Sequence, residues 1–186
     1  MSVGSVAFRS KTFAFAGQPL TENETDTNPI ARMFRFVDGD WIELANGIFG
    51  NFESTAYIIE MSADGNIVAV SNYYTELWQG ELNDALDVRV FEWDGSQWVQ
   101  LGENLHALAP GEKSGYFITL ADDGKLMGMG DPGRRSEEGG GVAGHVHIYR
   151  FKDDTREWRQ VGPNRDGDAP GDQFGNSVVL SGDGQH

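Results

Sequence analysis

The 186-residue chain carries 29 acidic side chains against 14 lysines and arginines, which gives a net charge of −15 at pH 7. This charge argues against nucleic acid as a partner and against docking on anionic lipid, because both would be repelled. The chain has no cysteine, which excludes disulfides, thiolate metal sites and cysteine catalysis. It also lacks an apolar run approaching the roughly 18 residues that would indicate a membrane-spanning helix.

In chain order, the first round of predicted structure is a hairpin, a polar loop and a strand–turn–strand unit. Gly4–Phe8 and Phe13–Gly17 have the composition of two short strands. Gln18–Pro29, with a proline near each end and three acids, is typical of a surface loop. The unit that follows, Ala31–Ala45, places an Asp-Gly turn between aromatic strands.

The second round repeats this order with a clearer pattern. Ala56–Met61 and Ile67–Ser71 are apolar strands joined by the Asp-Gly turn of Ser62–Gly65, which is a strong hairpin signal. The acidic segment Asn72–Asp87 is interpreted as a loop. The strand–turn–strand unit then recurs as Val88–Gly102.

The third round follows the same plan. Strands are predicted at Gly115–Leu120 and Leu126–Gly130, and a glycine-rich loop at Asp131–Gly144. The unit appears again as Val146–Gly162, and Phe174–Leu180 is predicted to be one further strand. These elements define a single repeat domain over residues 1–186. Its predicted blades are 4–45, 56–102 and 115–162, with the start of a fourth at 174–186.

The spacing of the units indicates a repeat architecture: Phe34 and Phe91 are 57 positions apart, and Phe91 and Tyr149 are 58 apart. In the middle unit Val88 and Val90 point to one side, while Phe91 and the tryptophan after it point to the other. A strand that is apolar on both faces is buried on both faces. Repeated four-stranded sheets covering one another predict an all-β, β-propeller-type fold; the competing interpretation is a β-sandwich.

The repeated pattern resembles the FG-GAP repeats of integrin α-like β-propellers. Phe174-Gly175 stands at the Phe-Gly position, and Gly17-Gln18-Pro19 and Gly130-Asp131-Pro132 stand at the Gly-Ala-Pro position. The resemblance implies a propeller, a protein-binding role and an extracellular or cell-surface location, although Met1–Gly17 lacks the apolar region of a signal peptide. It does not carry over calcium to the short hairpins, which are too poor in carboxylates. Three rounds are fewer than the four to eight blades that usually close a ring. The chain is therefore interpreted as a partial ring, a ring completed by another chain, or an open arc.

Two groups of side chains are weak metal candidates. His145 and His147 lie two apart on a strand, so both face the same way, but no further ligand is visible. Asp166, Asp168 and Asp172 share one loop and could begin a calcium site, although an acidic turn is favoured for them. No cofactor is expected, with calcium as the open exception.

The binding candidates lie in the loops between the repeats, because loops on a rigid scaffold carry function. They are Tyr73, Tyr74, Trp78, Arg134 and Arg135, although the two tyrosines could instead extend the preceding strand. The tryptophans inside the repeats are interpreted as structural, packing between blades; they are Trp41, Trp98 and Trp158.

No catalytic constellation is visible, so the chain is predicted to be a non-enzymatic binding or scaffold module. Its partner would be a protein or the rest of its own ring. Contacts are expected through the interblade loops Gln18–Pro29, Asn72–Asp87 and Asp131–Gly144. A carbohydrate-binding or glycan-acting propeller, and a structural subunit of a larger, possibly oligomeric assembly, remain as alternatives.

Overall fold

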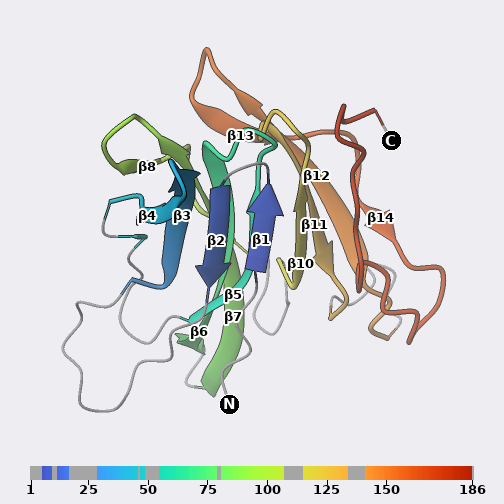
Figure 1. The fold of residues 1–186 in the computed structure, drawn as a ribbon. Coiled ribbons are helices and arrows are strands. Elements are labelled where there is room, and N and C mark those ends of the chain that lie inside the picture. The colour runs from blue at the N-terminus through green and yellow to red at the C-terminus, as the bar shows by residue number, and fades with distance from the viewer. Residues whose placement is uncertain are drawn as a thin grey trace.

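In the computed structural model, the described residues form an all-β structure of three antiparallel sheets, without a helix (Figure 1). The structure describes residues 6–9, 12–16, 29–45, 47–48, 55–78, 81–106, 115–133 and 141–185. Sheet 1 has the strand order β1-β2-β3-β4. Its strands are β1 (Val6–Arg9), β2 (Thr12–Ala16), β3 (Ala31–Val37) and β4 (Asp40–Glu43). The all-β prediction and the first predicted hairpin are confirmed.

Sheets 2 and 3 repeat this up-and-down order and each adds one short strand. Sheet 2 has the order β5-β6-β7-β8, with β9 paired to β7; sheet 3 has the order β10-β11-β12-β13, with β14 paired to β12. The strands of sheet 2 are β5 (Thr55–Met61), β6 (Ile67–Trp78), β7 (Glu81–Trp93), β8 (Trp98–Gln100) and β9 (Leu105–His106). Those of sheet 3 are β10 (Phe117–Leu120), β11 (Leu126–Asp131), β12 (His145–Lys152), β13 (Glu157–Gln160) and β14 (Arg165–Asp166).

Sheet 2 is covered on both faces, as its apolar pattern predicts. Val68 and Val70 of β6 enter one buried cluster, together with Met33 of sheet 1. The alternate residue Ala69 and Val90 of β7 enter a second cluster that includes residues of sheet 3. Because successive side chains of a strand point to opposite faces, one sheet supplies both clusters. The cores therefore lie between sheets 1 and 2 and between sheets 2 and 3.

Backbone hydrogen bonds connect the first hairpin turns of successive rounds. The Ala63 N–H donates to the Asp122 carbonyl at 3.0 Å, and the Asp122 N–H donates to the Gly182 carbonyl at 2.8 Å. These three residues occupy the same position in their turns, 59 and 60 residues apart. The turns thus form a continuous line of contacts along one side of the sheets.

A tryptophan joins the outer strands of sheets 2 and 3. Trp158 is 9% exposed, and its Nε1 donates to the Leu101 carbonyl at 2.8 Å. Its ring lies over Gly102, where an added Cβ would be 2.8 Å from the indole Cδ1. Trp98 in the preceding round likewise packs with Leu44 against the cluster between sheets 1 and 2. The structural role expected for these two tryptophans is confirmed, whereas the equivalent Trp41 is 49% exposed.

Sheet 1 carries an ion pair with two hydrogen bonds, between Arg32 of β3 and Glu43 of β4. Arg32 donates to Glu43 through Nε at 2.7 Å and through Nη2 at 2.5 Å. This hydrogen bonding by Arg32 lowers the pKa of the Glu43 carboxyl, against a smaller opposing effect of burial. Both side chains are partly exposed, so the pair stabilises the sheet only modestly.

Two expectations about secondary structure are wrong. Asn72–Asp87 is not a loop, because residues 72–78 and 81–87 extend β6 and β7 as paired strands. Phe174–Leu180 is not a strand: within it only Phe174 forms a bridge, to Gly144. A strand requires a neighbour that completes its ladder, and here the Leu180 N–H reaches only the Thr119 hydroxyl, at 3.4 Å. The segment lies instead against Gly128, where an added Cβ would be 2.9 Å from the Val178 side chain.

Candidate functional site

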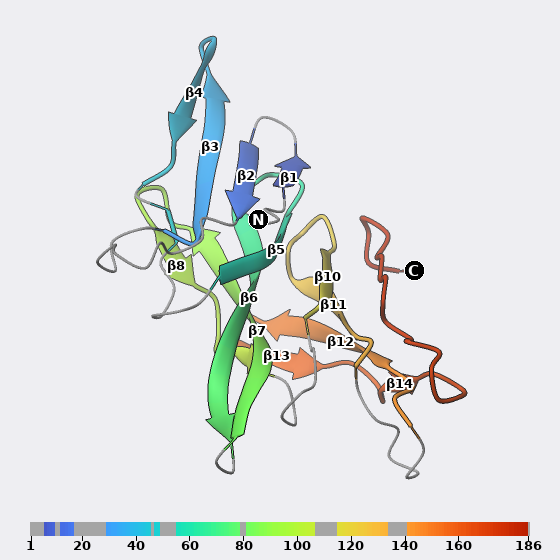
Figure 2. The same cartoon turned by 90° about the horizontal axis from the view of Figure 1, so that it is seen from below.

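The most distinctive feature of the described chain is a long two-stranded arm formed by β6 and β7. Pairing of β5 with β6 ends at Thr55 and Tyr73, and pairing of β9 with β7 ends at Asp87 and His106. Beyond these points the two strands pair only with each other within the described residues, from Tyr74–Ala85 to Trp78–Glu81. Figure 2 shows this arm extending beyond the rest of its sheet.

The aromatic candidates all lie on this arm. Tyr73 and Tyr74 extend the second strand of the hairpin, which was the alternative left open by the sequence, and Trp78 is the last residue of β6. In register Tyr73 stands opposite Leu86, Tyr74 opposite Ala85, and Trp78 opposite Glu81. The three aromatic residues are therefore brought onto one projecting element rather than a loop.

A buried polar network holds the base of the arm. Asn72 donates from Nδ2 to one carboxylate oxygen of Asp87 at 2.9 Å, and Asn104 donates to the other at 2.7 Å. Asn72 is 1% and Asp87 is 7% exposed. Burial lowers the pKa of the neighbouring Arg89, while the Asp87 carboxylate counteracts this. These side-chain hydrogen bonds tie β6 to β7, and β7 to Asn104 beside β9, at the base of the arm.

This network is a feature that the sequence analysis missed. The available signal was a pair of polar residues, Asn72 and Asp87, immediately flanking two strongly apolar strands. Buried polar groups of this kind are nearly always hydrogen-bonded, so the two residues could have been paired in advance.

The histidine pair is brought together, with the two rings within hydrogen-bonding distance of each other. His145 and His147 are 1% and 2% exposed, and their Nε2 atoms are 2.5 Å apart. Two nitrogens sharing a tetrahedral zinc at the usual bond length of about 2.0 Å would be about 3.3 Å apart. On the other side of His145, Nδ1 lies 3.3 Å from Asp166 Oδ1. The arrangement ties β12 to β14 across their paired backbones.

The acidic loop does not gather its carboxylates. Asp166 faces His145, while Asp172 accepts a hydrogen bond from the Ala169 N–H at 2.8 Å and so closes its own turn. Asp168 is exposed. Within the part of the chain that the structure describes, no three histidine, aspartate or glutamate side chains converge as metal ligands would. Arg134 and Arg135 lie outside the described residues.

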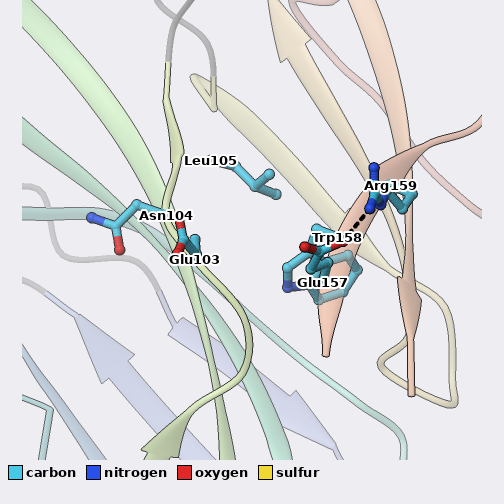
Figure 3. A pocket seen from close by; sticks show the side chains of 6 residues that line it. All are labelled: Glu103, Asn104, Leu105, Glu157, Trp158 and Arg159. Carbon is cyan, nitrogen blue, oxygen red and sulfur yellow. Dashed lines mark ion pairs between the residues drawn. The ribbon is translucent and has the colours of Figure 1, made fainter. Parts of the chain in front are cut away.

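A pocket of about 240 Å³ lies at the junction of the outer strands of sheets 2 and 3 (Figure 3). The residues that line it are Glu103, Asn104, Leu105, Glu157, Trp158 and Arg159. The Trp158 Nε1 is occupied by the Leu101 carbonyl, and the Glu157 carboxylate is paired with Arg159. Of the lining side chains, Trp158 thus joins the two sheets, whereas the ion pair of Glu157 and Arg159 lies within β13.

Comparison with protein-family models and with curated proteins finds no match for this chain. None of the described residues forms a helix long and apolar enough to cross a membrane.

Proposed function

We propose that the chain is a non-enzymatic scaffold of the β-propeller type that binds a protein partner through the β6–β7 arm. The propeller arrangement is supported by three sheets in sequence order, by the burial of sheet 2 on both faces, and by the repeated turn-to-turn hydrogen bonds. In this arrangement each sheet is one blade of the FG-GAP-like repeat.

The proposed binding role rests on how far the arm extends beyond the strands β5 and β9 that flank it. Five residue pairs, from Tyr74–Ala85 to Trp78–Glu81, are supported by no third strand within the described residues. A two-stranded hairpin alone is only marginally stable in water, and its outer edges offer backbone groups that another strand can pair with. Strand addition from a partner would satisfy these edges and stabilise the arm.

The composition of the arm suggests the chemistry of the partner. Residues 74–85 include Glu76, Glu81 and Asp84 but neither lysine nor arginine, and they include Tyr74 and Trp78. Aromatic residues provide large contact area at protein interfaces, and complementary charge steers encounter. A basic, extended protein segment fits this combination best.

A site-specific photo-crosslinking experiment tests the proposal. A photoreactive phenylalanine analogue is placed at Thr75 in the arm and, as a matched control, at Ser96 in the exposed β7–β8 turn of the same sheet. Each protein is irradiated in extract from its natural source. We expect a discrete crosslinked species from Thr75 and not from Ser96, competed by excess unmodified chain.

A shortened chain sharpens this test. Residues 74–85 are replaced by Asn-Gly, so that the opposed residues Tyr73 and Leu86 are joined by a two-residue hairpin turn. Both apolar clusters lie outside the deleted segment, so cooperative unfolding is expected to persist. If the folded short form competes as well as the full chain, the arm is not the binding element. If the full chain binds glycans on an array and the short form still binds them, the carbohydrate alternative is favoured.

A further inference from the structure

Asp-Gly pairs recur in the turns of this chain, and each pair contains the two groups needed for a spontaneous ring closure. The main-chain nitrogen of the glycine can attack the side-chain carboxyl carbon of the aspartate, because glycine has no side chain to obstruct the approach. The reaction is fastest when that nitrogen is not hydrogen-bonded and the carboxyl group can turn toward it. The six pairs of the sequence are Asp38-Gly39, Asp64-Gly65, Asp94-Gly95, Asp123-Gly124, Asp166-Gly167 and Asp183-Gly184.

The attacking nitrogen is already hydrogen-bonded in four of these pairs. The N–H groups that donate to main-chain carbonyls, at 2.9 to 3.0 Å, are those of Gly65, Gly124, Gly167 and Gly184. Among the described residues, the N–H groups of Gly39 and Gly95 make no such bond. Four pairs must therefore break a main-chain hydrogen bond before the nitrogen can react, and two need not.

The carboxylate is held in place in five of the pairs. Asp94 accepts hydrogen bonds from the Ser96 N–H, the Ser96 hydroxyl and the Gln97 N–H, at 2.8 to 2.9 Å. The other four are held as follows: Asp64 by Ser62 and Asn66, Asp123 by the Lys125 N–H, Asp166 by His145, and Asp183 by Ser181 and Gln185. Asp38 is exposed and has no hydrogen bond or ion pair in the described part of the chain. Only in Asp38-Gly39 are both reacting groups without a hydrogen bond.

Hydrogen bonds to a carboxylate also keep it ionised. The Gln97 and Ser96 N–H groups lower the pKa of the Asp94 carboxyl. The Ser181 hydroxyl lowers the pKa of Asp183 in the same way. Ring closure requires the neutral carboxyl group, because its hydroxyl leaves as water, whereas an ionised carboxylate offers no such leaving group. Asp94 is thus protected by its carboxylate, although the nitrogen of the glycine that follows it makes no hydrogen bond.

The local geometry of Asp38-Gly39 also leaves room for a ring. The pair forms the tip of the β3–β4 hairpin, a two-residue turn closed by Val37 opposite Asp40. Its φ angles are +52° at the aspartate and +101° at the glycine, as such a turn requires. A Cβ added to the glycine would meet nothing within 4 Å. The β7–β8 and β12–β13 turns are exposed as well, so exposure is a property of this kind of turn in every round.

We propose that Asp38 is a site of covalent self-modification, at which the chain converts its own aspartate into a β-linked aspartyl residue. The Gly39 nitrogen bonds to the Asp38 Cγ, and the carboxyl hydroxyl leaves with the amide proton as one water molecule. The resulting five-membered imide takes up one water. Opening at the Cγ carbonyl restores aspartate, whereas opening at the main-chain carbonyl leaves a free α-carboxylate and a main chain that runs through the side chain.

The β-linked product lengthens the turn by one main-chain atom. Turn length sets the register of a hairpin, so the pairing of Val37 with Asp40 is loosened in the product. The reaction involves no residue of the β6–β7 arm, so the proposal stands if partner binding through the arm fails.

Incubation of the folded chain in water enriched in oxygen-18 tests the proposal. Each cycle of closure and opening leaves one heavy oxygen at the reacting residue, which tandem mass spectrometry of the peptides locates. At mildly acidic pH we expect Asp38 to take up at least about tenfold more label than any other Asp-Gly pair, since each hydrogen bond that must break slows closure by roughly that factor. In urea these hydrogen bonds are lost, and the six pairs should take up label at comparable rates.

Two matched variants identify the attacking nitrogen. Asparagine tolerates a left-handed backbone, so Gly39→Asn keeps the turn while its side chain obstructs the attack, and labelling of Asp38 should fall severalfold. Gly95→Asn makes the same change in the β7–β8 turn, at φ +103°, and should leave labelling of Asp38 unchanged. Three results would each overturn the proposal: another Asp-Gly pair that labels as fast as Asp38 in the folded chain, a preference for Asp38 that persists in urea, or labelling that Gly39→Asn does not reduce.

Discussion

Gly102 and Gly162 allow the packing of the Trp158 ring to be measured by a matched pair of substitutions. Both residues close the outer-strand turn of their round with a left-handed backbone, at φ +78° and +72°. At Gly102 an added Cβ lies 2.8 Å from Trp158 Cδ1 and 3.4 Å from Phe151 Cε2, whereas at Gly162 it meets nothing within 4 Å. Alanine at the two sites therefore carries the same backbone cost but a different packing cost.

The expected magnitudes follow from these distances. A non-glycine residue in the left-handed conformation costs about 1–2 kcal/mol, which is the expectation for Gly162→Ala. Ala45 adopts φ +56° at the same position of round 1, so the turn itself accepts alanine. Gly102→Ala must in addition displace a buried indole held by a hydrogen bond, and overpacking of this kind costs about 1–3 kcal/mol more.

Urea unfolding followed by tryptophan fluorescence gives the two free energies of unfolding. We expect Gly102→Ala to be the more destabilising by about 1–3 kcal/mol, with a similar dependence on urea. Equal destabilisation by the two substitutions would refute the packing of Trp158 on Gly102.

Three further expectations follow from described contacts. Glu43→Gln removes a carboxylate whose pKa is lowered by its arginine partner, so we expect a loss below about 1 kcal/mol at neutral pH. That loss should vanish as the pH falls through the lowered pKa, because the parent chain then also loses the interaction. Urea titrations at neutral pH and at a pH below the lowered pKa check this. Ser62→Ala leaves a buried backbone N–H without its acceptor and should cost about 1–2 kcal/mol, clearly more than Ser181→Ala in the less buried equivalent turn, by the same unfolding assay. Zinc should leave the thermal midpoint unchanged, because His145 and His147 are held too close to share it; a shift that saturates at one zinc per chain would contradict this.

The sequence predicted those parts of the fold in which pairing and burial coincide. The alternation of Val88 and Val90 against Phe91 marks opposite faces, and the structure divides these residues between two clusters as expected. The positions of His145 and His147 on one side of a strand were likewise predictable from their spacing.

The sequence was misleading where a segment pairs its backbone without an apolar pattern, or has apolar residues without a pairing partner. The arm between Asn72 and Asp87 is rich in acidic and amide residues that strands rarely contain, yet its backbone pairs throughout. The opposite holds for Phe174–Leu180, whose apolar residues predict a strand although no described strand pairs with it beyond the bridge from Phe174 to Gly144. Pairing depends on a second segment being present, and a local pattern cannot report that.

The line of hydrogen bonds from Ala63 to Asp122 to Gly182 is made by main-chain atoms alone. Its members are an alanine, an aspartate and a glycine, so the hydrogen bonds do not depend on side-chain identity; only at Gly182 would an added Cβ clash, with the Asp122 carboxylate. Such a contact lets the sequences of the repeats diverge while the turns keep their relative positions. A comparison of residue identities cannot detect it. Proline is the exception, because it has no N–H to donate. A full substitution scan at Ala63 and Asp122 should accordingly show broad tolerance interrupted by proline.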